Sequence, residues 1–300
     1  MISAELQKFI EESGSFKKDY ELKKINWFQV GGKADLVFRP KDADELQKFL
    51  QLKQDLPIFV MGVGSNIIIR DGGFRGCVIR LGRAFTEYKQ LSEYEVEIGA
   101  ANLDLNIALY AAKLGISKLE FLSGIPGTIG GGIKMNAGAY GGEFKDVLVK
   151  ASGYDEGGNY HEFTADEMNY SYRKSNPPQE IIYTKCVLRG EVGDSAEISE
   201  RIKKIQETRE ASQPLRTKTG GSTFKNPEGY NAWKLVDEAG GRGFVVGDAI
   251  MSEKHCNFMI NRGNATASDL ENLGNQVKQK VKEKTGIDLV WEIKIIGDLV

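Results

Sequence analysis

Apolar positions along the chain follow two different periods, which predicts a mixture of helices and strands. Apolar residues recur every three or four positions in segments that we expect to be helical, at 42–54, 103–114, 195–212, 231–240 and 266–285. Short apolar or alternating runs predict strands at 57–61, 66–69, 94–98, 148–154, 160–164, 181–188 and 288–296. The two kinds of element therefore alternate along the whole chain.

Residues 121–143 (FLSGIPGTIGGGIKMNAGAYGGE) break this pattern, because eight glycines stand among apolar residues. Glycine lacks a Cβ, so its backbone can approach a ligand closely and can adopt positive φ without strain. We do not expect an ordinary helix or strand here, since each interior glycine costs up to about 1 kcal/mol. The stretch predicts either backbone loops against a flat or phosphate-bearing ligand or tight turns on a buried core, and we favour the ligand.

A second glycine loop spans residues 62–66 (GVGSN), and a third spans 219–227 (TGGSTFKNP). A Rossmann dinucleotide loop opens a helix. Here Ile67, Ile68 and Ile69 follow the second loop, and β-branched residues favour a strand, so we predict strand–turn–strand. Residues 31–34 (GGKA) lack the length and the hydroxyl of a GxxxxGK[ST] phosphate loop.

Composition excludes several classes of protein. The 300 residues suffice for two or three domains, and 41% apolar with 27% charged residues is typical of a globular protein. A net charge of −2 gives no reason to expect nucleic acid or anionic membrane as partners. No apolar run is long enough to span a membrane and no signal-peptide core is seen, so we expect a cytoplasmic protein. Three scattered cysteines and two histidines predict neither disulfides nor a metal site.

Two polar features remain open to more than one interpretation. Residues 169–175 (NYSYRKS) place two tyrosines beside two cations, and the residues alone favour a solvated edge with a ring-stacked arginine. In the strand expected at 288–296, Glu292 shares a face with Val290 and Ile296. Such an acid lies either at a sheet edge in water, which is the commoner case, or half-buried with a function. Residues 190–194 form a plausible joint between domains.

Seven motifs occur in order along the chain, and together they resemble those of one family. They are residues 27–34 (WFQVGGKA, resembling T-x-R-V-G-G-x-A), 62–71 (GVGSNIIIRD, resembling G-x-G-S-N-x-L-x-x-D), 124–131 (GIPGTIGG), 135–141 (MNAGAYG), Tyr172-Arg173, 221–227 (GSTFKNP) and Glu292. From about residue 20 to 297 the chain is similar to the UDP-N-acetylenolpyruvoylglucosamine reductase family. Ser222 and Glu292 make this resemblance more specific than the glycine loops alone.

This resemblance implies an α+β fold with a two-subdomain FAD-binding domain of the vanillyl-alcohol-oxidase/PCMH type and a C-terminal α+β substrate-binding domain. The implied ranges are 1–193 for the FAD-binding domain (subdomains about 1–82 and 83–193) and 194–300 for the substrate-binding domain. FAD is expected to bind non-covalently against the glycine loops. The residues implied to bind it are Gly62, Val63, Gly64, Ser65, Asn66, Ile67, Gly124, Pro126, Gly127, Thr128, Gly130, Gly131, Asn136, Ala137, Gly138, Ala139 and Tyr140.

The resemblance also implies a reaction. A hydride passes from NADPH to FAD and then to the enolpyruvyl double bond of UDP-N-acetylglucosamine-enolpyruvate, which gives UDP-N-acetylmuramate for peptidoglycan synthesis. Arg173 is expected to stabilise the enolate-like anion, because a guanidinium engages both carboxylate oxygens and keeps its charge. Ser222 is expected to deliver the proton. Glu292 is expected to lie beside the carboxylate and to be partly protonated because of its aliphatic surroundings.

The residues implied to bind the substrate are Tyr172, Lys225, Asn226, Arg242 and His255. The chain departs from the family pattern at Trp27 and Gln29, where threonine and arginine are usual, and at Gly240-Gly241 before Arg242, where a leucine-lysine pair is common. A tyrosine-bearing insertion that closes over the substrate in one branch is not evident. The chain therefore resembles the shorter type, with a more open site.

The sequence leaves two other functions to consider. An FAD oxidase of the same fold would use oxygen, and many such enzymes tether the flavin to an early histidine; here no histidine precedes His161. A nucleotide-binding module without catalysis would be favoured by loss of Arg173, Ser222 or Glu292, and all three are present. We therefore expect a monomeric enzyme that acts on a small molecule, with no nucleic-acid, membrane or metal partner.

Overall fold

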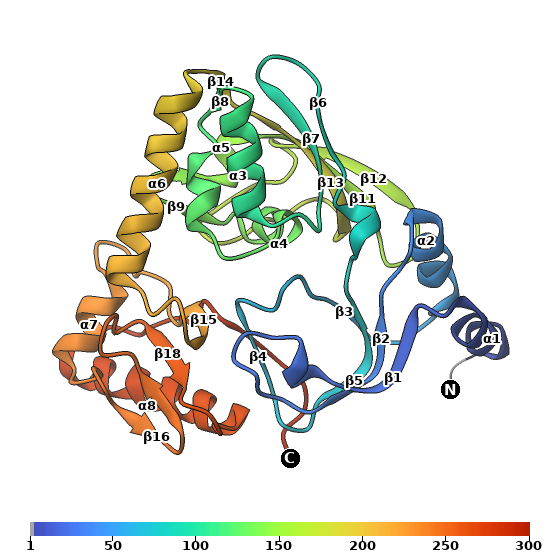
Figure 1. Ribbon diagram of the computed structural model, residues 1–300. Coiled ribbons are helices and arrows are strands. Elements are labelled where there is room, and N and C mark those ends of the chain that lie inside the picture. Colours follow the sequence, from blue (N-terminus) through green and yellow to red (C-terminus); the bar gives the residue numbers. More distant parts are fainter. Residues whose placement is uncertain (1–2) are drawn as a thin grey trace. The chain divides into compact units, whose positions relative to one another are not determined.

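The computed structural model describes residues 3–300, which form two compact units (Figure 1). The first unit comprises the chain up to residue 17 together with 36–62 and 76–207, and the second comprises 18–35, 63–75 and 208–300. Within the described chain we find no helix with both the length and the apolar character needed to cross a membrane.

Helices and 3₁₀ turns occur throughout the chain. They are α1 (Ala4–Ser13), η1 (Leu22–Lys24), α2 (Ala43–Leu52), η2 (Arg83–Phe85), α3 (Asp104–Lys113), η3 (Glu120–Gly124), α4 (Ile129–Met135), α5 (Phe144–Val147), α6 (Ser195–Ser212), α7 (Ala232–Glu238) and α8 (Ala267–Thr285). The helices expected at 42–54, 103–114, 195–212, 231–240 and 266–285 are thereby confirmed to within two residues at most ends.

Among residues 3–300 the strands form six sheets. A four-stranded sheet has the order β1 (Phe16–Glu21), β2 (Lys33–Phe38), β5 (Phe74–Ile79), β3 (Ile58–Val60), and β3 pairs with β5 in parallel. An antiparallel sheet of the first unit has the order β12 (Tyr160–Thr164), β11 (Leu148–Tyr154), β13 (Ile182–Arg189), β7 (Glu95–Gly99), β6 (Tyr88–Gln90). Two small ribbons are β9 (Gly138–Ala139) with β10 (Gly142–Glu143), and β8 (Ile116–Ser117) with β14 (Glu191–Val192).

The second unit holds the remaining two sheets. One has the order β15 (Lys218–Ser222), β18 (Phe258–Asn261), β17 (Ala249–Met251), β16 (Val245–Val246). In the other, β19 (Lys294–Ile296), close to the C-terminus, runs parallel to β4 (Ile67–Ile69), so the red end of the chain follows β4 in Figure 1. Phe28, Val30 and Ile68 belong to the same buried core as α7, α8 and β17, which explains why two early segments fold with the C-terminal third.

The first unit has two cores. One lies between the five-stranded sheet and helices α3 and α4, with Ile98, Ile107 and Ile133 fully buried. The other gathers α1, α2 and the strands they cover around Phe38 and Phe49, whose ring centroids are 4.6 Å apart. The continuous domains predicted at 1–193 and 194–300 stay a prediction, since a compact unit and a functional domain need not coincide.

Helix ends follow local chemistry at some positions and tertiary contacts at others. Thr266 and Asp269 form a reciprocal capping box at the start of α8, and Gly286 ends that helix at φ 75°. Asn102 is of a residue type that often caps helices, but it does not cap α3. Leu103 occupies the cap position, and the Asn102 amide donates instead to the carbonyl of Gly99.

The expectation that the central glycine stretch forms no helix is also wrong in part. Gly130, Gly131 and Gly132 lie inside α4. A Cβ at Gly132 would overlap the fully buried ring of Phe144, and one at Gly130 would lie 3.2 Å from the Cβ of Ala100. Close packing within the first unit therefore requires a narrow helix here, and its glycines are tolerated because tertiary contacts outweigh propensity.

Two expected strand boundaries are corrected. The strand predicted at 288–296 is regular only in β19, and before it Trp291 makes an isolated antiparallel bridge to Phe224. The turn predicted at 219–227 begins as strand β15, which continues to Ser222. In both segments pairing with a distant part of the chain decides the backbone conformation.

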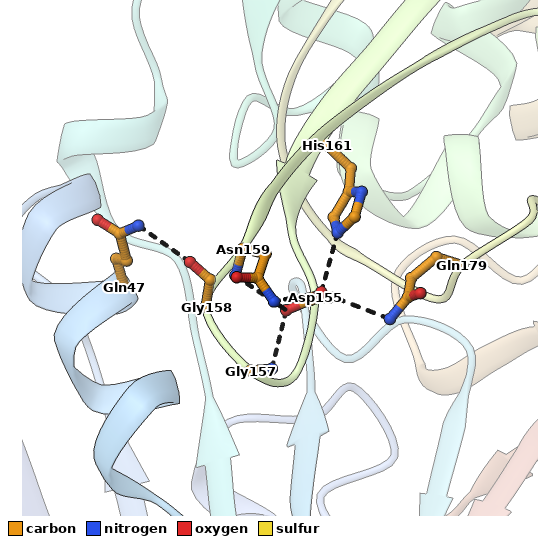
Figure 2. Close-up of polar contacts among 7 residues, drawn as sticks. All are labelled: Gln47, Asp155, Gly157, Gly158, Asn159, His161 and Gln179. Carbon is orange, nitrogen blue, oxygen red and sulfur yellow. Dashed lines mark hydrogen bonds and ion pairs between the residues drawn. The ribbon is translucent and has the colours of Figure 1, made fainter.

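A buried carboxylate organises the turn between β11 and β12 (Figure 2). The Oδ1 of Asp155 accepts hydrogen bonds from the backbone N–H groups of Gly157 and Asn159, both at 2.9 Å, and its Oδ2 lies 2.9 Å from Nε2 of His161. Gln47 of α2 donates to the carbonyl of Gly158 at 2.9 Å, which fastens the turn to the helix. Burial opposes ionisation of Asp155, but hydrogen bonds from the Asn159 side-chain amide at 3.0 Å, from His161 and from the two backbone N–H groups outweigh it and lower its pKa to about 2.

Gly132→Ala is expected to destabilise the ligand-free protein by roughly 1–3 kcal/mol, because the new methyl group overlaps a ring with no room to move. Gly131→Ala in the same helix is the matched control. Gly131 is exposed and its Cβ would meet only Thr128 Oγ1, at 3.7 Å, so alanine should be neutral or stabilising by up to about 1 kcal/mol. Urea unfolding followed by circular dichroism measures both, and equal effects would contradict the packing argument.

Asp155→Asn is expected to lower the free energy of unfolding at pH 7 by roughly 1–3 kcal/mol. The folded pKa lies below the unfolded value, so the stabilisation is present above about pH 4 and is lost as pH falls toward 2. The difference between variant and wild type should therefore shrink in that acid window. A difference that stays constant from pH 7 to pH 3, or an equal effect from exposed Asp166→Asn, would speak against this role.

Candidate active site

In the second unit the glycine loop meets the segment that carries Glu292. The Asn66 side-chain amide donates to the carbonyl of Glu292 at 3.2 Å, and the amide of Lys294 donates to the carbonyl of Asn66 at 3.1 Å. On the other side of the loop, the amide of Trp27 donates to the carbonyl of Gly64 at 3.0 Å. Gly64 has φ 72°, and a Cβ there would lie 2.7 Å from the Cα of Asn26, so this turn requires glycine.

Ser222 lies at the end of β15, where it pairs with Phe258. The register shifts between Thr219 and Ser222, and Gly221 has φ 75°, so an irregularity precedes the serine and redirects it. The next residue, Thr223, accepts a hydrogen bond at its carbonyl from the amide of Glu292 at 2.9 Å. The structure thus brings Ser222 and Glu292 onto neighbouring chain segments. Glu292 is half-buried, which corrects the commoner expectation of a sheet edge in water.

Three residues of this unit that are expected to bind the substrate make different kinds of contact within the protein. Lys225 follows the Ser222 segment, and its amide donates to the carbonyl of Val290 at 2.9 Å. The side-chain oxygen of Asn226 accepts from the amide of Ala232 at 2.9 Å and so supports the start of α7. The guanidinium of Arg242 donates to both carboxyl oxygens of Asp237, at 2.9 and 2.7 Å, and also to the carbonyl of Glu253.

His255 is half-buried between two rings. Its ring centroid lies 4.6 Å from that of Phe258 and 6.4 Å from that of Trp233. Burial lowers the pKa of His255 below its ordinary value, with a smaller contribution from Arg242 in the same direction. A neutral imidazole can take part in stacking or accept a hydrogen bond, and here its Nδ1 accepts from the amide of Asn257 at 3.3 Å.

Arg173 lies in the first unit and contacts the glycine-rich stretch at residues 121–143. Its Nη2 donates to the carbonyl of Gly138 at 2.9 Å, and its guanidinium lies 5.0 Å from the ring centroid of Tyr172. Arg173 has φ 56°, a left-handed conformation that is uncommon for a side-chain-bearing residue and is often found at functional sites. The ring-stacked arginine expected from the sequence is therefore observed.

The segment around Arg173 is largely exposed, as expected, with Asn169, Tyr172 and Lys174 in solvent, but its backbone is fastened to the first unit. The Asn136 amide donates to the carbonyl of Ser171 at 3.1 Å and to the carboxylate of Glu143 at 2.6 Å, and its oxygen accepts from the amide of Lys145 at 2.9 Å. Asn136 is fully buried, so its side chain serves as a clasp within this unit. The signal in the sequence was its place in MNAGAYG, which does not distinguish a clasp from a ligand contact.

The remaining glycine-loop residues lie against side chains of the first unit. A Cβ at Gly124 would lie 2.7 Å from the ring of Tyr140, one at Gly127 would lie 2.9 Å from Oδ2 of Asp104, and one at Gly62 would overlap the hydroxyl of Thr128. Several of these glycines therefore serve close packing. Gly131 and Tyr140, by contrast, are exposed.

Asp104 is a feature that the sequence did not single out. It is fully buried at the start of α3, and neither carboxyl oxygen has a hydrogen-bond partner among residues 3–300. Its own amide donates to the carbonyl of Gly127 at 3.2 Å, so it lies directly beneath the GIPG loop. Burial raises the pKa of Asp104 well above its ordinary value, which favours the neutral acid.

A cavity of about 780 Å³ lies within the second unit beside Trp27. Trp27 is 40% exposed, and the other lining side chains include Arg216, Lys218 and Arg262. The lining residues in the described chain include no carboxylate, although Arg262 also pairs with Asp248 at 3.1 Å and Arg216 with Glu210 at 3.3 Å. An aromatic face with several cations suits an anionic ligand that carries a ring.

These observations fit FAD. The Gly64 turn lies next to this cavity through the Trp27–Gly64 hydrogen bond, and backbone loops with cations nearby suit a pyrophosphate. In the second unit, residues 63–66 and the cavity side chains would hold the cofactor.

Comparisons with known proteins give the class first. Residues 34–164 match the family described as FAD binding domain, and residues 213–296 match the UDP-N-acetylenolpyruvoylglucosamine reductase C-terminal domain. A variant of berberine bridge enzyme, described as a reticuline dehydrogenase, shares the fold over 63% of this chain and 44% of its own, with a TM-score of 0.51 and 12% identity. Fold and site therefore define an FAD-binding protein, and the expected α+β fold is confirmed.

Several relatives match almost the whole chain. The UDP-N-acetylenolpyruvoylglucosamine reductases of Rickettsia bellii (strain RML369-C) and Rickettsia rickettsii (strain Sheila Smith) are 50% and 51% identical over 95% of this chain and 94% and 96% of their own. The crystal structure of the corresponding reductase from Thermus caldophilus matches with a TM-score of 0.82 and 34% identity, over 93% of this chain and 98% of its own. The chain belongs to the UDP-N-acetylenolpyruvoylglucosamine reductase family.

Asp104→Asn is expected to make the FAD-free protein more resistant to urea at pH 8 than at pH 5, relative to wild type. The folded pKa of Asp104 is raised, so wild-type stability is highest below the unfolded pKa of about 3.9 and declines as pH rises toward the folded value. The amide does not ionise and removes this decline. Urea midpoints at the two pH values test the idea, which fails if the variant shifts both midpoints equally.

Proposed function

We propose that this chain is an FAD-dependent oxidoreductase that reduces the enolpyruvyl double bond of UDP-N-acetylglucosamine-enolpyruvate, with NADPH as hydride donor. The product would be UDP-N-acetylmuramate, a precursor for peptidoglycan synthesis. The proposal is supported by the relatives' names and by one observation above all. The glycine loop, Ser222 and Glu292 adjoin one another within a single unit, through Asn66 to the Glu292 carbonyl and through the Glu292 amide to the Thr223 carbonyl.

Ser222 is proposed as the proton donor. FAD, when bound, supplies the hydride, and a proton is then needed at the carbon beside the substrate carboxylate. A hydroxyl is a weak acid, so it serves only because the carbanion-like centre is a strong base and because the donor is held in place. The paired backbone on both sides of Ser222 gives that fixed position.

Arg173 is proposed to stabilise the charge that develops in the transition state. The hydrogen bond to Gly138 and the ring of Tyr172 orient its guanidinium, and its left-handed backbone is held by the clasp of Asn136 on Ser171. A pre-oriented cation needs no reorganisation when charge appears, which is the main source of electrostatic catalysis. Glu292 is proposed as a hydrogen-bond partner of the substrate carboxylate.

The other roles follow the same proposal. Tyr172, Lys225, Asn226 and His255 would bind the substrate, with Lys225 on its diphosphate. Arg242 would also bind the substrate. Because it already contacts Asp237 and Glu253, the substrate would have to displace these partners. We propose FAD binding chiefly by residues 1–193 and substrate binding chiefly by 194–300, in a cytoplasmic monomer with no nucleic-acid or membrane partner.

Ser222→Ala is the test of this proposal. The purified protein should be yellow and should bleach with NADPH at the wild-type rate, because hydride transfer to FAD needs no proton from Ser222. Anaerobic recolouring by the enolpyruvyl sugar nucleotide should be slowed by roughly 10²–10⁴-fold, the range for loss of a positioned acid. Stopped-flow absorbance measures both steps.

Exposed Ser212→Ala at the end of α6 is the control and should recolour like wild type. Equal recolouring by Ser222→Ala and wild type would remove Ser222 from the proton-donor role. A protein that is never recoloured by the enolpyruvyl sugar nucleotide, or that yields no lactyl ether by mass spectrometry, would overturn the proposed reaction itself.

A further inference from the structure

Asn257 makes the hydrogen bonds that a paired strand would make just beyond Ser222. Its carbonyl accepts from the amide of Thr223 at 2.6 Å. Its side chain then takes both backbone groups of Phe224, because Oδ1 accepts from the Phe224 amide at 3.0 Å and Nδ2 donates to the Phe224 carbonyl at 2.8 Å. The amide side chain therefore replaces one residue of a neighbouring strand, at the place where the regular β15–β18 ladder has ended.

The segment held by Asn257 is also held from its other side. The amide of Glu292 donates to the Thr223 carbonyl at 2.9 Å, and the amide of Lys225 donates to the Val290 carbonyl at 2.9 Å. The ring of Phe224, which is 1% exposed, lies 5.3 Å from that of Trp291. Residues 223–225 are thus fixed between Asn257 and the segment that carries Glu292.

Only asparagine provides both the acceptor and the donor that the Phe224 backbone needs at this position. Asn257 is 4% exposed, so every polar atom of its side chain must find a partner within the protein. Aspartate offers no donor for the Phe224 carbonyl and would bring a buried charge against it, alanine leaves two buried backbone groups unpaired, and glutamine is one methylene too long for a filled site.

We propose that Asn257 is a positioning residue for proton transfer by Ser222, which acts by fixing the backbone of residues 223–224 against Glu292. This rests on the proposed function, in which Ser222 is the donor. Proton transfer depends steeply on geometry, and a displacement of about 1 Å can cost about 10²-fold in rate. Loss of the Asn257 hydrogen bonds should therefore slow recolouring by the substrate, which uses Ser222. Bleaching by NADPH does not use Ser222 and should be unchanged.

The test uses the FAD-loaded protein and the variants Asn257→Ala, Asn257→Asp, Ser222→Ala and the double variant Ser222→Ala/Asn257→Ala. Bleaching by NADPH and anaerobic recolouring by the enolpyruvyl sugar nucleotide are followed separately by stopped flow. We expect recolouring of Asn257→Ala and Asn257→Asp to slow by roughly 10–100-fold with wild-type bleaching, and the double variant to be no slower than Ser222→Ala. Recolouring in D₂O should show a larger solvent isotope effect in the Asn257 variants than in wild type.

Thr219→Val is the matched control. Thr219 is 5% exposed on the same strand, and its hydroxyl donates across to the Met259 carbonyl at 2.7 Å, so valine removes a buried bond between the same two strands ahead of Ser222. A comparable loss of thermal stability with near wild-type recolouring is expected. If Thr219→Val slows recolouring as much as Asn257→Ala, the effect is general loosening and the inference is wrong.

Three further outcomes separate this inference from the proposed function. Wild-type recolouring in the Asn257 variants, or a double variant slower than Ser222→Ala by the full Asn257 factor, overturns the positioning role but leaves Ser222 as donor. Wild-type recolouring in Ser222→Ala alone overturns the donor role instead. If Asn257→Ala does not fold, Asn257→Asp, which keeps the size and one acceptor, decides the matter by the same measurements.

Discussion

The hydrogen bond from the Glu292 amide to the Thr223 carbonyl is the contact on which the proposed chemistry depends. It joins two segments nearly seventy residues apart in sequence and sets the backbone of Ser222 beside that of Glu292. Asn66 then ties the glycine loop to the same segment through the Glu292 carbonyl. The backbone N–H and carbonyl of Glu292 therefore link the segment of the proposed proton donor to the glycine loop, because backbone groups that are buried must be paired.

Buried polar groups in this protein are used mainly to fix backbone conformation. Asn136 clasps the segment before Arg173, and Asp155 organises a turn far from the proposed chemistry. Asp104 differs from both, since it is buried beneath the GIPG loop without a partner in the described chain. An amide or carboxylate that meets several backbone groups at once removes alternative conformations, which a hydrophobic contact of equal area does not do.

Glycine serves two purposes that a sequence does not separate. Gly132 and Gly124 are small because the rings of Phe144 and Tyr140 occupy the space beside them, whereas Gly131 is exposed and has that space open. The first purpose is close packing against side chains, and the second is to keep the backbone open to the surface. Both give the same letter in the sequence, so the glycine-rich stretch predicts a ligand site without showing which of its glycines serve packing.

The sequence by itself determined the helices with strong periodicity, the strand–turn–strand form of the 62–66 loop and, through ordered motifs, the family. These features depend on local chemistry or on residue identity, which the sequence contains. Only the tertiary structure decided that Gly130, Gly131 and Gly132 lie within helix α4. It also decided that residues 18–35 and 63–75 fold with the C-terminal third, and that Asn257 holds the Ser222 segment. Those outcomes depend on contacts between residues far apart in the chain, where close packing and the pairing of buried backbone groups outweigh local preference.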